Sequence, residues 1–143
     1  MRALAVLVLL LAGCTTYRDD LQRGQTAFEQ DKYERALAMF RALEPDMSQL
    51  TAQERGHYAY LRGMTDYRIG YRADARHWLM VARAIDGETP GSLPTDWKTR
   101  MKEALGELNE QVYKEGTASL TNTRRPQGEE PRAAPKKKSE DEP

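Results

Sequence analysis

Two segments of the chain share one order of small and large residues, 39 positions apart. The clearer copy is GMTDYRIGYRADARHWLMVA, which begins at Gly63, and the weaker copy is GQTAFEQDKYERALAMFRAL, which begins at Gly24. Each copy predicts two short helices joined by a tight turn, because its apolar residues recur at helical spacing on both sides of one turn residue. The recurrence of such a unit indicates a helical repeat protein, in which neighbouring units bury each other's apolar sides.

The aligned positions predict where the two helices of each hairpin approach most closely. The aligned pairs are Gly24 with Gly63, Phe28 with Tyr67, Asp31 with Gly70, Ala36 with Ala75, and Phe40 with Leu79. Small residues allow two backbones to come close, because a large side chain would hold the helices apart. We therefore expect tight contacts of Gly24 with Ala36 and of Gly63 with Ala75, with Phe40 and Leu79 in the layer below.

The first two helices are bounded by recognisable start and stop signals. The first is expected over Tyr17–Gln30, where apolar residues recur on one side. Asp31 with Glu34 has the spacing of a capping box, so the second helix is expected to begin at Lys32. Pro45 is expected to end it, because proline lacks the backbone N–H that a helix interior requires.

The next two helices surround the central turn. Thr51 with Glu54 forms a second capping-box pattern, which predicts the start of the third helix. Gly70 supplies the flexible backbone for the turn into the fourth helix. No stretch of the chain shows the sustained alternation of a β-strand, so we predict an all-α fold.

The segment 87–94, GETPGSLP, interrupts the helical pattern, and Thr95 or Asp96 is expected to cap a fifth helix. That helix carries the strongest amphipathic stripe of the chain, which consists of Trp97, Met101, Ala104, Leu105, Leu108 and Val112. A last helix of this kind covers the exposed end of a repeat stack. The expected folded domain therefore spans residues 17–115.

The residue order G-x3-[FY]-x7-A-x3-[FL] resembles the tetratricopeptide repeat (TPR). The resemblance implies two TPR-like helical hairpins and a C-terminal capping helix in an α–α superhelix, with structural positions at Gly24, Ala36, Phe40, Gly63, Ala75 and Leu79. Arg23 and Arg62 replace the large apolar residue that the family has before the glycine, and Asp66 replaces another packed residue. Arg62 and Asp66 are four residues apart, so we expect them to pair at the surface.

The TPR resemblance also implies a binding site. In that family, the inner side of each first helix lines a groove for a partner segment. Carried over by position, the groove residues are Arg18, Leu21, Gln25, Phe28, Glu29, His57, Tyr60, Met64, Tyr67 and Arg68. Phe28, Tyr58 and Trp78 are interpreted as core residues, because aromatic side chains at helical spacing are usually buried. Tyr60, Met64 and Arg68 are the favoured groove residues.

The first 13 residues are interpreted as an export signal. Arg2 is followed by the apolar run Ala3–Leu11, which is much shorter than the ~20 residues of a membrane-spanning helix. The sequence Leu-Ala-Gly-Cys then ends at Cys14 and resembles the lipobox of bacterial lipoproteins. The resemblance implies cleavage after residue 13, a lipidated N-terminus at residues 14–16 and acylation of Cys14. The alternatives are an ordinary secretory signal and a buried core cysteine.

Thr15, rather than an aspartate, follows the cysteine. In lipoproteins of double-membraned bacteria this favours sorting to the outer membrane, with the domain on the periplasmic face. Residues 116–143 are rich in proline and charge, so we expect a disordered, solvated tail. The alternative is that Lys136–Lys138 contacts anionic envelope polymers or headgroups, although Glu140–Glu142 beside it would largely cancel the attraction.

Composition excludes several classes of function. Lys and Arg number 22 and Asp and Glu number 22, so no basic field predicts nucleic-acid binding. The single cysteine allows no intramolecular disulfide. His57 and His77 are the only histidines, and no catalytic, phosphate-binding or metal-binding motif is present. We therefore predict that the chain is not an enzyme and needs no cofactor or metal.

These patterns favour a lipid-anchored adaptor that binds another envelope protein in an assembly of the pilus, secretion or outer-membrane biogenesis type. The alternatives are a structural envelope lipoprotein, in which the hairpins self-associate as a homo-oligomer, and a non-catalytic accessory subunit of an envelope enzyme. This assignment rests on fold and location alone.

Overall fold

The computed structural model describes residues 16–121, so the signal segment, Cys14 and residues 122–143 lie outside the described part of the chain. The described part is all-α, as the sequence predicts. Its helices are α2 (Thr16–Glu29), α3 (Tyr33–Leu43), α4 (Ala52–Ile69), α5 (Arg72–Glu88) and α6 (Thr95–Glu115), with two short 3₁₀ helices, η1 (Glu44–Gln49) and η2 (Thr117–Ser119).

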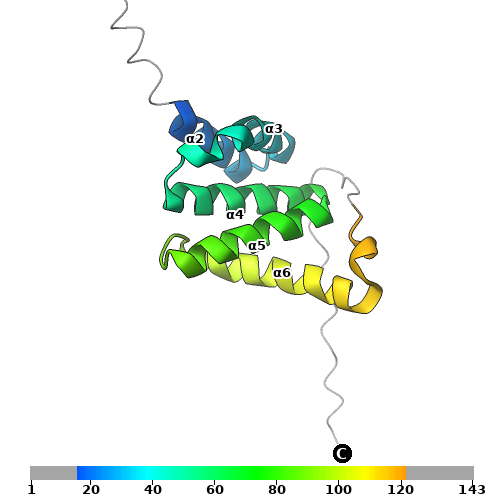
Figure 1. The fold of residues 1–143 in the computed structure, drawn as a ribbon. Helices are drawn as coiled ribbons and strands as arrows, with labels where there is room; N and C mark the ends of the chain where they lie inside the picture. Colours follow the sequence, from blue (N-terminus) through cyan, green and yellow to red (C-terminus); the bar gives the residue numbers. More distant parts are fainter. Residues whose placement is uncertain (1–15, 122–143) are drawn as a thin grey trace, which may run out of the picture.

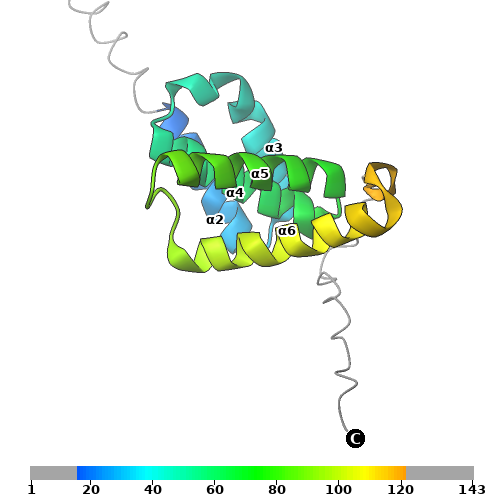
Figure 2. The ribbon, with the colours of Figure 1, turned by 60° about the horizontal axis from the view of Figure 1, so that its bottom comes forward.

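The helices form two antiparallel hairpins and a closing helix. Figure 1 shows the α2–α3 hairpin at the top, α4 beneath it, and α5 and α6 below. Figure 2 shows α6 running along the α4–α5 hairpin. Helix α4 is central, because it packs against α5, α3, α2 and α6. Consequently every residue from Tyr58 to Tyr67 is buried, as expected for a helix that is surrounded by others.

The two hairpin turns have the same backbone structure. Asp31 and Gly70 both have a positive φ, 57° and 101°. The Lys32 N–H donates to the Ala27 oxygen at 2.9 Å, and 39 residues later the Tyr71 N–H donates to the Asp66 oxygen at 2.8 Å. The repeat is therefore present in the hydrogen bonding as well as in the sequence.

The closest contact within each hairpin differs from the expected one. A Cβ on Gly24 would lie 2.5 Å from Phe40 Cε1, and a Cβ on Gly63 would lie 2.8 Å from Leu79 Cγ. The nearest atoms thus belong to Phe40 and Leu79 rather than to Ala36 and Ala75. These two alanines are fully buried, but the large side chain one turn later reaches across to the glycine.

The capping predictions are partly confirmed. The Glu54 N–H donates to Thr51 Oγ1 at 3.2 Å, and the Thr51 N–H donates to Glu54 Oε2 at 2.9 Å, which completes the predicted capping box. The prediction for Asp31 is wrong, because Asp31 occupies the left-handed turn and Lys32 precedes the helix without a side-chain cap.

Two other predicted boundaries also differ. Thr95 is the first residue of α6, and Pro94 precedes it without a side-chain cap, so neither Thr95 nor Asp96 caps this helix. Helix α3 ends at Leu43, and Pro45 lies in the first turn of η1. A proline at this position is favoured, because the first turn of a helix needs no N–H donor.

The end of the domain lies beyond the predicted limit of residue 115. Helix α6 buries Met101, Ala104, Leu105 and Leu108, as its stripe predicts. After it, Leu120 packs against the hydrophobic core, and the side-chain amide of Gln111 donates to the Ser119 oxygen at 2.9 Å. The first residues of the predicted tail, through Leu120, therefore belong to the folded unit.

Candidate functional site

The structure buries the centre of the predicted groove. Leu21, Tyr60, Met64 and Tyr67 are all at most 7% exposed. Side chains that are this buried cannot contact a partner unless the domain opens. The groove prediction is therefore wrong for these four residues.

Helix α6 of the same chain covers the second-repeat part of this surface, on α4. The Trp97 ring stacks on the Tyr60 ring, with centroids 4.4 Å apart and planes 12° apart, and lies 5.0 Å from the His57 ring. The Tyr67 hydroxyl donates to the Glu107 carboxylate. Burial raises the pKa of Tyr60 to about 12 and lowers the pKa of His57. The capping helix thus occupies the space that the family resemblance assigns to a partner.

Several of the other predicted groove residues make local contacts with neighbouring side chains. Arg18 Nε lies 2.6 Å from Glu54 Oε1, and the amide of Gln25 donates to Glu29 at 2.8 Å. Arg68 is half-buried. The pKa of Glu54 is lowered mainly by the Thr51 backbone N–H, with a further contribution from Arg18. These contacts are typical of solvated helix surfaces.

The three aromatic residues interpreted as core are placed as follows. Tyr58 is fully buried, and Phe28 and Trp78 are partly buried and pack against the core. The Tyr58 ring makes edge contacts with Phe40 and Trp78, at centroid distances of 5.9 Å and 5.4 Å. The core interpretation is confirmed for Tyr58, whereas Phe28 and Trp78 lie at the edge of the core.

The contact between the two hairpins contains a charge network around the buried Arg62 and Asp66 side chains, which we call the hairpin joint. Arg62 Nε lies 2.9 Å from Asp66 Oδ2, and Arg62 Nη1 lies 2.9 Å from Glu44 Oε2. The Arg62 guanidinium also lies 5.5 Å from the Trp78 ring centroid. The Arg62 side chain is 5% exposed and that of Asp66 is 0% exposed. The expectation of a surface pair is therefore wrong, since α3 and η1 cover both residues.

Further contacts of the hairpin joint come from α3. The Tyr58 hydroxyl donates to the Phe40 oxygen at 2.9 Å, and the Arg41 guanidinium lies 5.7 Å from the Tyr71 ring centroid. Among the described residues, Asp66 Oδ1 has no hydrogen-bond partner. Burial raises the pKa of Asp66 to about 6, against the opposing effect of Arg62. At the hairpin joint, α3 and η1 thus pack against the α4–α5 hairpin.

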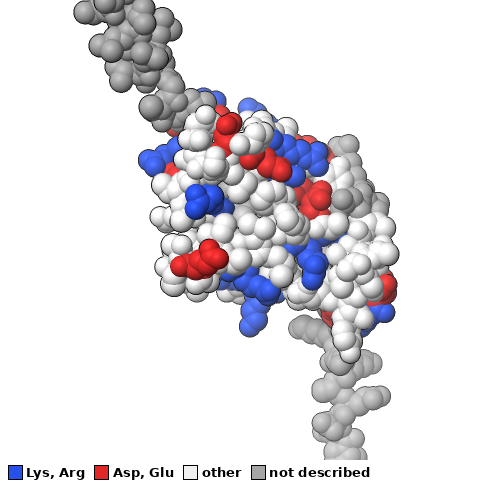
Figure 3. Space-filling view, in the orientation of Figure 1, with Lys and Arg blue, Asp and Glu red and all other residues white. Residues whose placement is uncertain are grey.

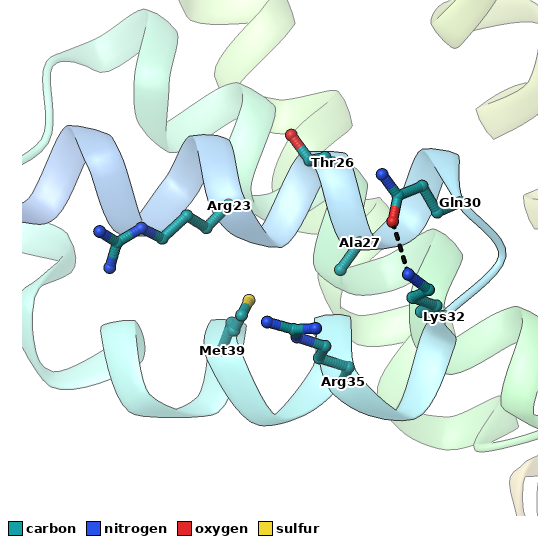
Figure 4. Close-up of a pocket in the computed structure, with 7 residues that line it drawn as sticks. All are labelled: Arg23, Thr26, Ala27, Gln30, Lys32, Arg35 and Met39. Carbon is teal, nitrogen blue, oxygen red and sulfur yellow. Dashed lines mark hydrogen bonds between the residues drawn. The ribbon is translucent and has the colours of Figure 1, made fainter.

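The α2–α3 hairpin also carries a pocket. We call the surface around this pocket the α2–α3 outer face. The pocket has a volume of about 280 Å³ and lies between α2 and α3 (Figure 4), and its lining residues are Arg23, Thr26, Ala27, Gln30, Lys32, Arg35 and Met39. Figure 4 shows Met39 and Arg35 projecting from α3 toward α2.

Repeat symmetry relates this pocket to the hairpin joint. Adding 39 to each lining position gives Arg62, Thr65, Asp66, Ile69, Tyr71, Asp74 and Trp78. In the second hairpin, Arg62, Thr65 and Asp66 are buried; in the first, Arg23, Thr26 and Arg35 are exposed. The α2–α3 outer face therefore has the same repeat position as the contact surface of the second hairpin, but within the described residues no further helix packs on it.

Comparison with protein-family models, with curated proteins and with solved structures finds no match for this chain. Among residues 16–121, no group of three or more His, Cys, Asp or Glu side chains is placed to hold a metal ion. No helix in that range is long and apolar enough to cross a bilayer. The candidate site therefore rests on the internal repeat and on local chemistry.

The pocket of the α2–α3 outer face is lined by three cations and no carboxylate. Lys32 Nζ donates to Gln30 at 2.8 Å, and Arg23 Nη1 lies 3.5 Å from Asp20 Oδ1, while both basic side chains remain exposed. Figure 3 shows acidic and basic residues interspersed over the visible surface. The sequence patterns alone did not predict this cluster. The repeat alignment does show that Arg35 stands at the position that Asp74 has in the second repeat.

Proposed function

We propose that the chain is a non-enzymatic adaptor that is held at the outer membrane by lipid on Cys14 and binds another envelope protein. The observation that carries this proposal is the α2–α3 outer face. On the second hairpin, the surface at the same repeat position packs against α3 of this chain. On the first hairpin, the α2–α3 outer face is exposed. The opposite end of the stack is closed by α6.

The position of Cys14 in the sequence supports the proposal. Helix α2 begins at Thr16, two residues after Cys14, so the domain would lie close to the bilayer. The Arg18–Glu54 pair joins the beginnings of α2 and α4 at this end of the molecule. Tethering raises the local concentration of a binding surface, so that a modest affinity suffices for assembly.

Photocrosslinking from two matched positions tests the binding site. Thr26 and Thr99 are both exposed helical threonines, and each hydroxyl donates to the carbonyl four residues earlier, at 3.0 Å and 3.1 Å. A photoreactive residue at Thr26 of the full chain, in its own cells, is expected to give an adduct with one defined envelope protein. The same residue at Thr99 on α6 serves as the control.

The crosslinking outcomes distinguish an adaptor from a structural subunit. An adduct from Thr26 that is lost on Arg35→Glu supports the adaptor, whereas equal adducts from both positions would contradict it. Adducts only between copies of the chain would favour a structural subunit. Cys14→Ser is expected to move the protein from the membrane fraction to the soluble fraction, and retention in the membrane would contradict the lipid anchor.

A further inference from the structure

We infer that the α2–α3 outer face binds an acidic amphipathic helix of the partner protein, seated as α3 is seated on the α4–α5 hairpin. This inference rests on the proposed adaptor function and adds the chemistry of the partner. It draws on the internal repeat, since one copy of the contact surface is occupied by a helix and the other is exposed.

The two surfaces share a local framework. The Thr65 hydroxyl donates to the Leu61 oxygen at 2.7 Å, and its counterpart Thr26 donates to the Gln22 oxygen at 3.0 Å. Arg62 stands three residues before Thr65, and its Nη1 lies 2.9 Å from Oε2 of Glu44, at the start of η1. Arg23 has the same position in α2, so a helix seated there would place a carboxylate against Arg23.

The differences between the two surfaces define the partner's charge. Tyr71 is replaced by Lys32, Asp74 by Arg35, and Asp66 by Ala27. Where α3 places Arg41 over the Tyr71 ring, a helix on the first hairpin would meet Lys32. A basic residue would be repelled at that position, whereas a carboxylate would be attracted. The partner helix therefore carries acidic residues at the positions of both Arg41 and Glu44.

A second copy of the chain fits this face less well. In a twofold symmetric dimer the same patch meets itself, so Arg23, Lys32 and Arg35 of one copy would face the same cations of the other. Asp19, which replaces Tyr58, lies one helical turn before Arg23 and is exposed. The acidic groups of the partner are therefore expected at the Lys32 end of the pocket rather than at the Asp19 end.

Peptides copied from the seated segment provide the probe. The parent peptide is YERALAMFRALEPDMSQL, residues 33–50. An acidic version carries Arg41→Glu, and a reversed version carries Glu44→Lys, with helix content compared by circular dichroism. Binding of each labelled peptide to the purified full-length protein is measured by fluorescence anisotropy. We expect the acidic version to bind at least about tenfold more tightly than the reversed version. We also expect its binding to weaken as salt rises from about 50 mM to about 500 mM.

Protein variants assign the effect to the pocket. Arg23→Glu with Arg35→Glu is expected to weaken binding of the acidic peptide about tenfold or more. Arg83→Glu with Lys102→Glu makes the same change in net charge at exposed positions of α5 and α6 and should leave binding unchanged. Equal effects of both double variants, or no binding of the acidic peptide at about 1 mM, would overturn the inference.

Two further results would assign the face to another occupant and so overturn the inference. Removal of residues 122–143 that raises peptide affinity about tenfold would show that the chain's own tail fills the face. A dimer by sedimentation that dissociates on Arg23→Glu with Arg35→Glu would identify a second copy. A Thr26 crosslink to an envelope protein without acidic-peptide binding would leave the adaptor function standing and remove only this inference.

Discussion

Arg23 and Arg62 occupy the same position in the two repeats but have opposite environments. Arg62 is buried between Asp66, Glu44 and the Trp78 ring, whereas the Arg23 side chain is 71% exposed. A buried ion pair is weak evidence for stability, because removing two charges from water is costly. Removing one partner of such a pair strongly destabilises the fold, because the other charge stays buried without compensation.

Asp66 gives a pH dependence whose sign follows from its environment. Its pKa in the fold is about 6, above the ordinary value of 3.8. Between these values the folded state keeps a proton that the unfolded state releases, so stability falls as pH rises through this window. Relative to Asp66→Asn, the wild type is expected to lose on the order of 3 kcal/mol between about pH 4 and about pH 7.

Urea unfolding of both proteins across this range measures the effect. Glu54 and Asp86 have lowered pKa values and act in the opposite direction, but they titrate in both proteins and cancel in the difference. A wild-type-minus-variant difference that is constant with pH, or that grows as pH rises, would contradict the burial of an ionisable Asp66.

Glycine at position 63 is required by packing. A Cβ there would lie 2.8 Å from Leu79 Cγ and 2.9 Å from the Leu79 backbone nitrogen, and the backbone cannot move away as a side chain can. We expect Gly63→Ala to destabilise the fold by about 2 kcal/mol, because overpacking exceeds the gain in helix propensity. A Cβ on Gly106, in α6, would meet no atom within 4 Å from the rest of the described residues, apart from its own helix backbone and chain neighbours, so Gly106→Ala should stabilise by about 0.5–1 kcal/mol. Thermal unfolding that ranks the variants in the reverse order would contradict this.

At the scale of single elements, alanine substitution of Thr51, which precedes α4, and of Thr95, which begins α6, should affect stability differently. Thr51→Ala removes the acceptor of the Glu54 N–H and is expected to cost about 1 kcal/mol. Thr95 lies inside α6 and makes no cap, so Thr95→Ala should change stability by less than about 0.5 kcal/mol. Denaturant unfolding measures both, and equal losses would show that the Thr51 capping box contributes nothing specific.

The helices themselves were predictable because their signals are local. Apolar spacing, the Thr51 capping box and the glycine at position 70 each act within a few residues. The error at Asp31 has the same origin, since Asp31 and Glu34 have capping-box spacing although Asp31 adopts the left-handed turn. Its alignment with Gly70 was the better signal, because both residues end a first helix at a positive φ.

At the scale of the whole molecule, the proposed binding surface was not predictable from one repeat. The groove residues depend on where α6 lies, and the spacing of the Trp97 stripe states which side of α6 is apolar but not which helix it covers. Trp97 stacks on Tyr60, so the second-repeat part of the predicted groove is closed by the chain's own capping helix. The exposed counterpart of the hairpin joint became recognisable only when the packing of the second hairpin was known.

Thiol labelling tests the central claim, that the α2–α3 outer face holds a partner at the membrane. The chain has one cysteine, Cys14, so Thr26→Cys or Thr99→Cys introduces a single new thiol into the domain. We compare the labelling rate with a maleimide in isolated outer membranes with the rate in the purified full-length protein. We predict slower labelling in membranes at Thr26→Cys and unchanged labelling at Thr99→Cys. Equal rates at Thr26→Cys in both preparations would contradict a bound partner on this face.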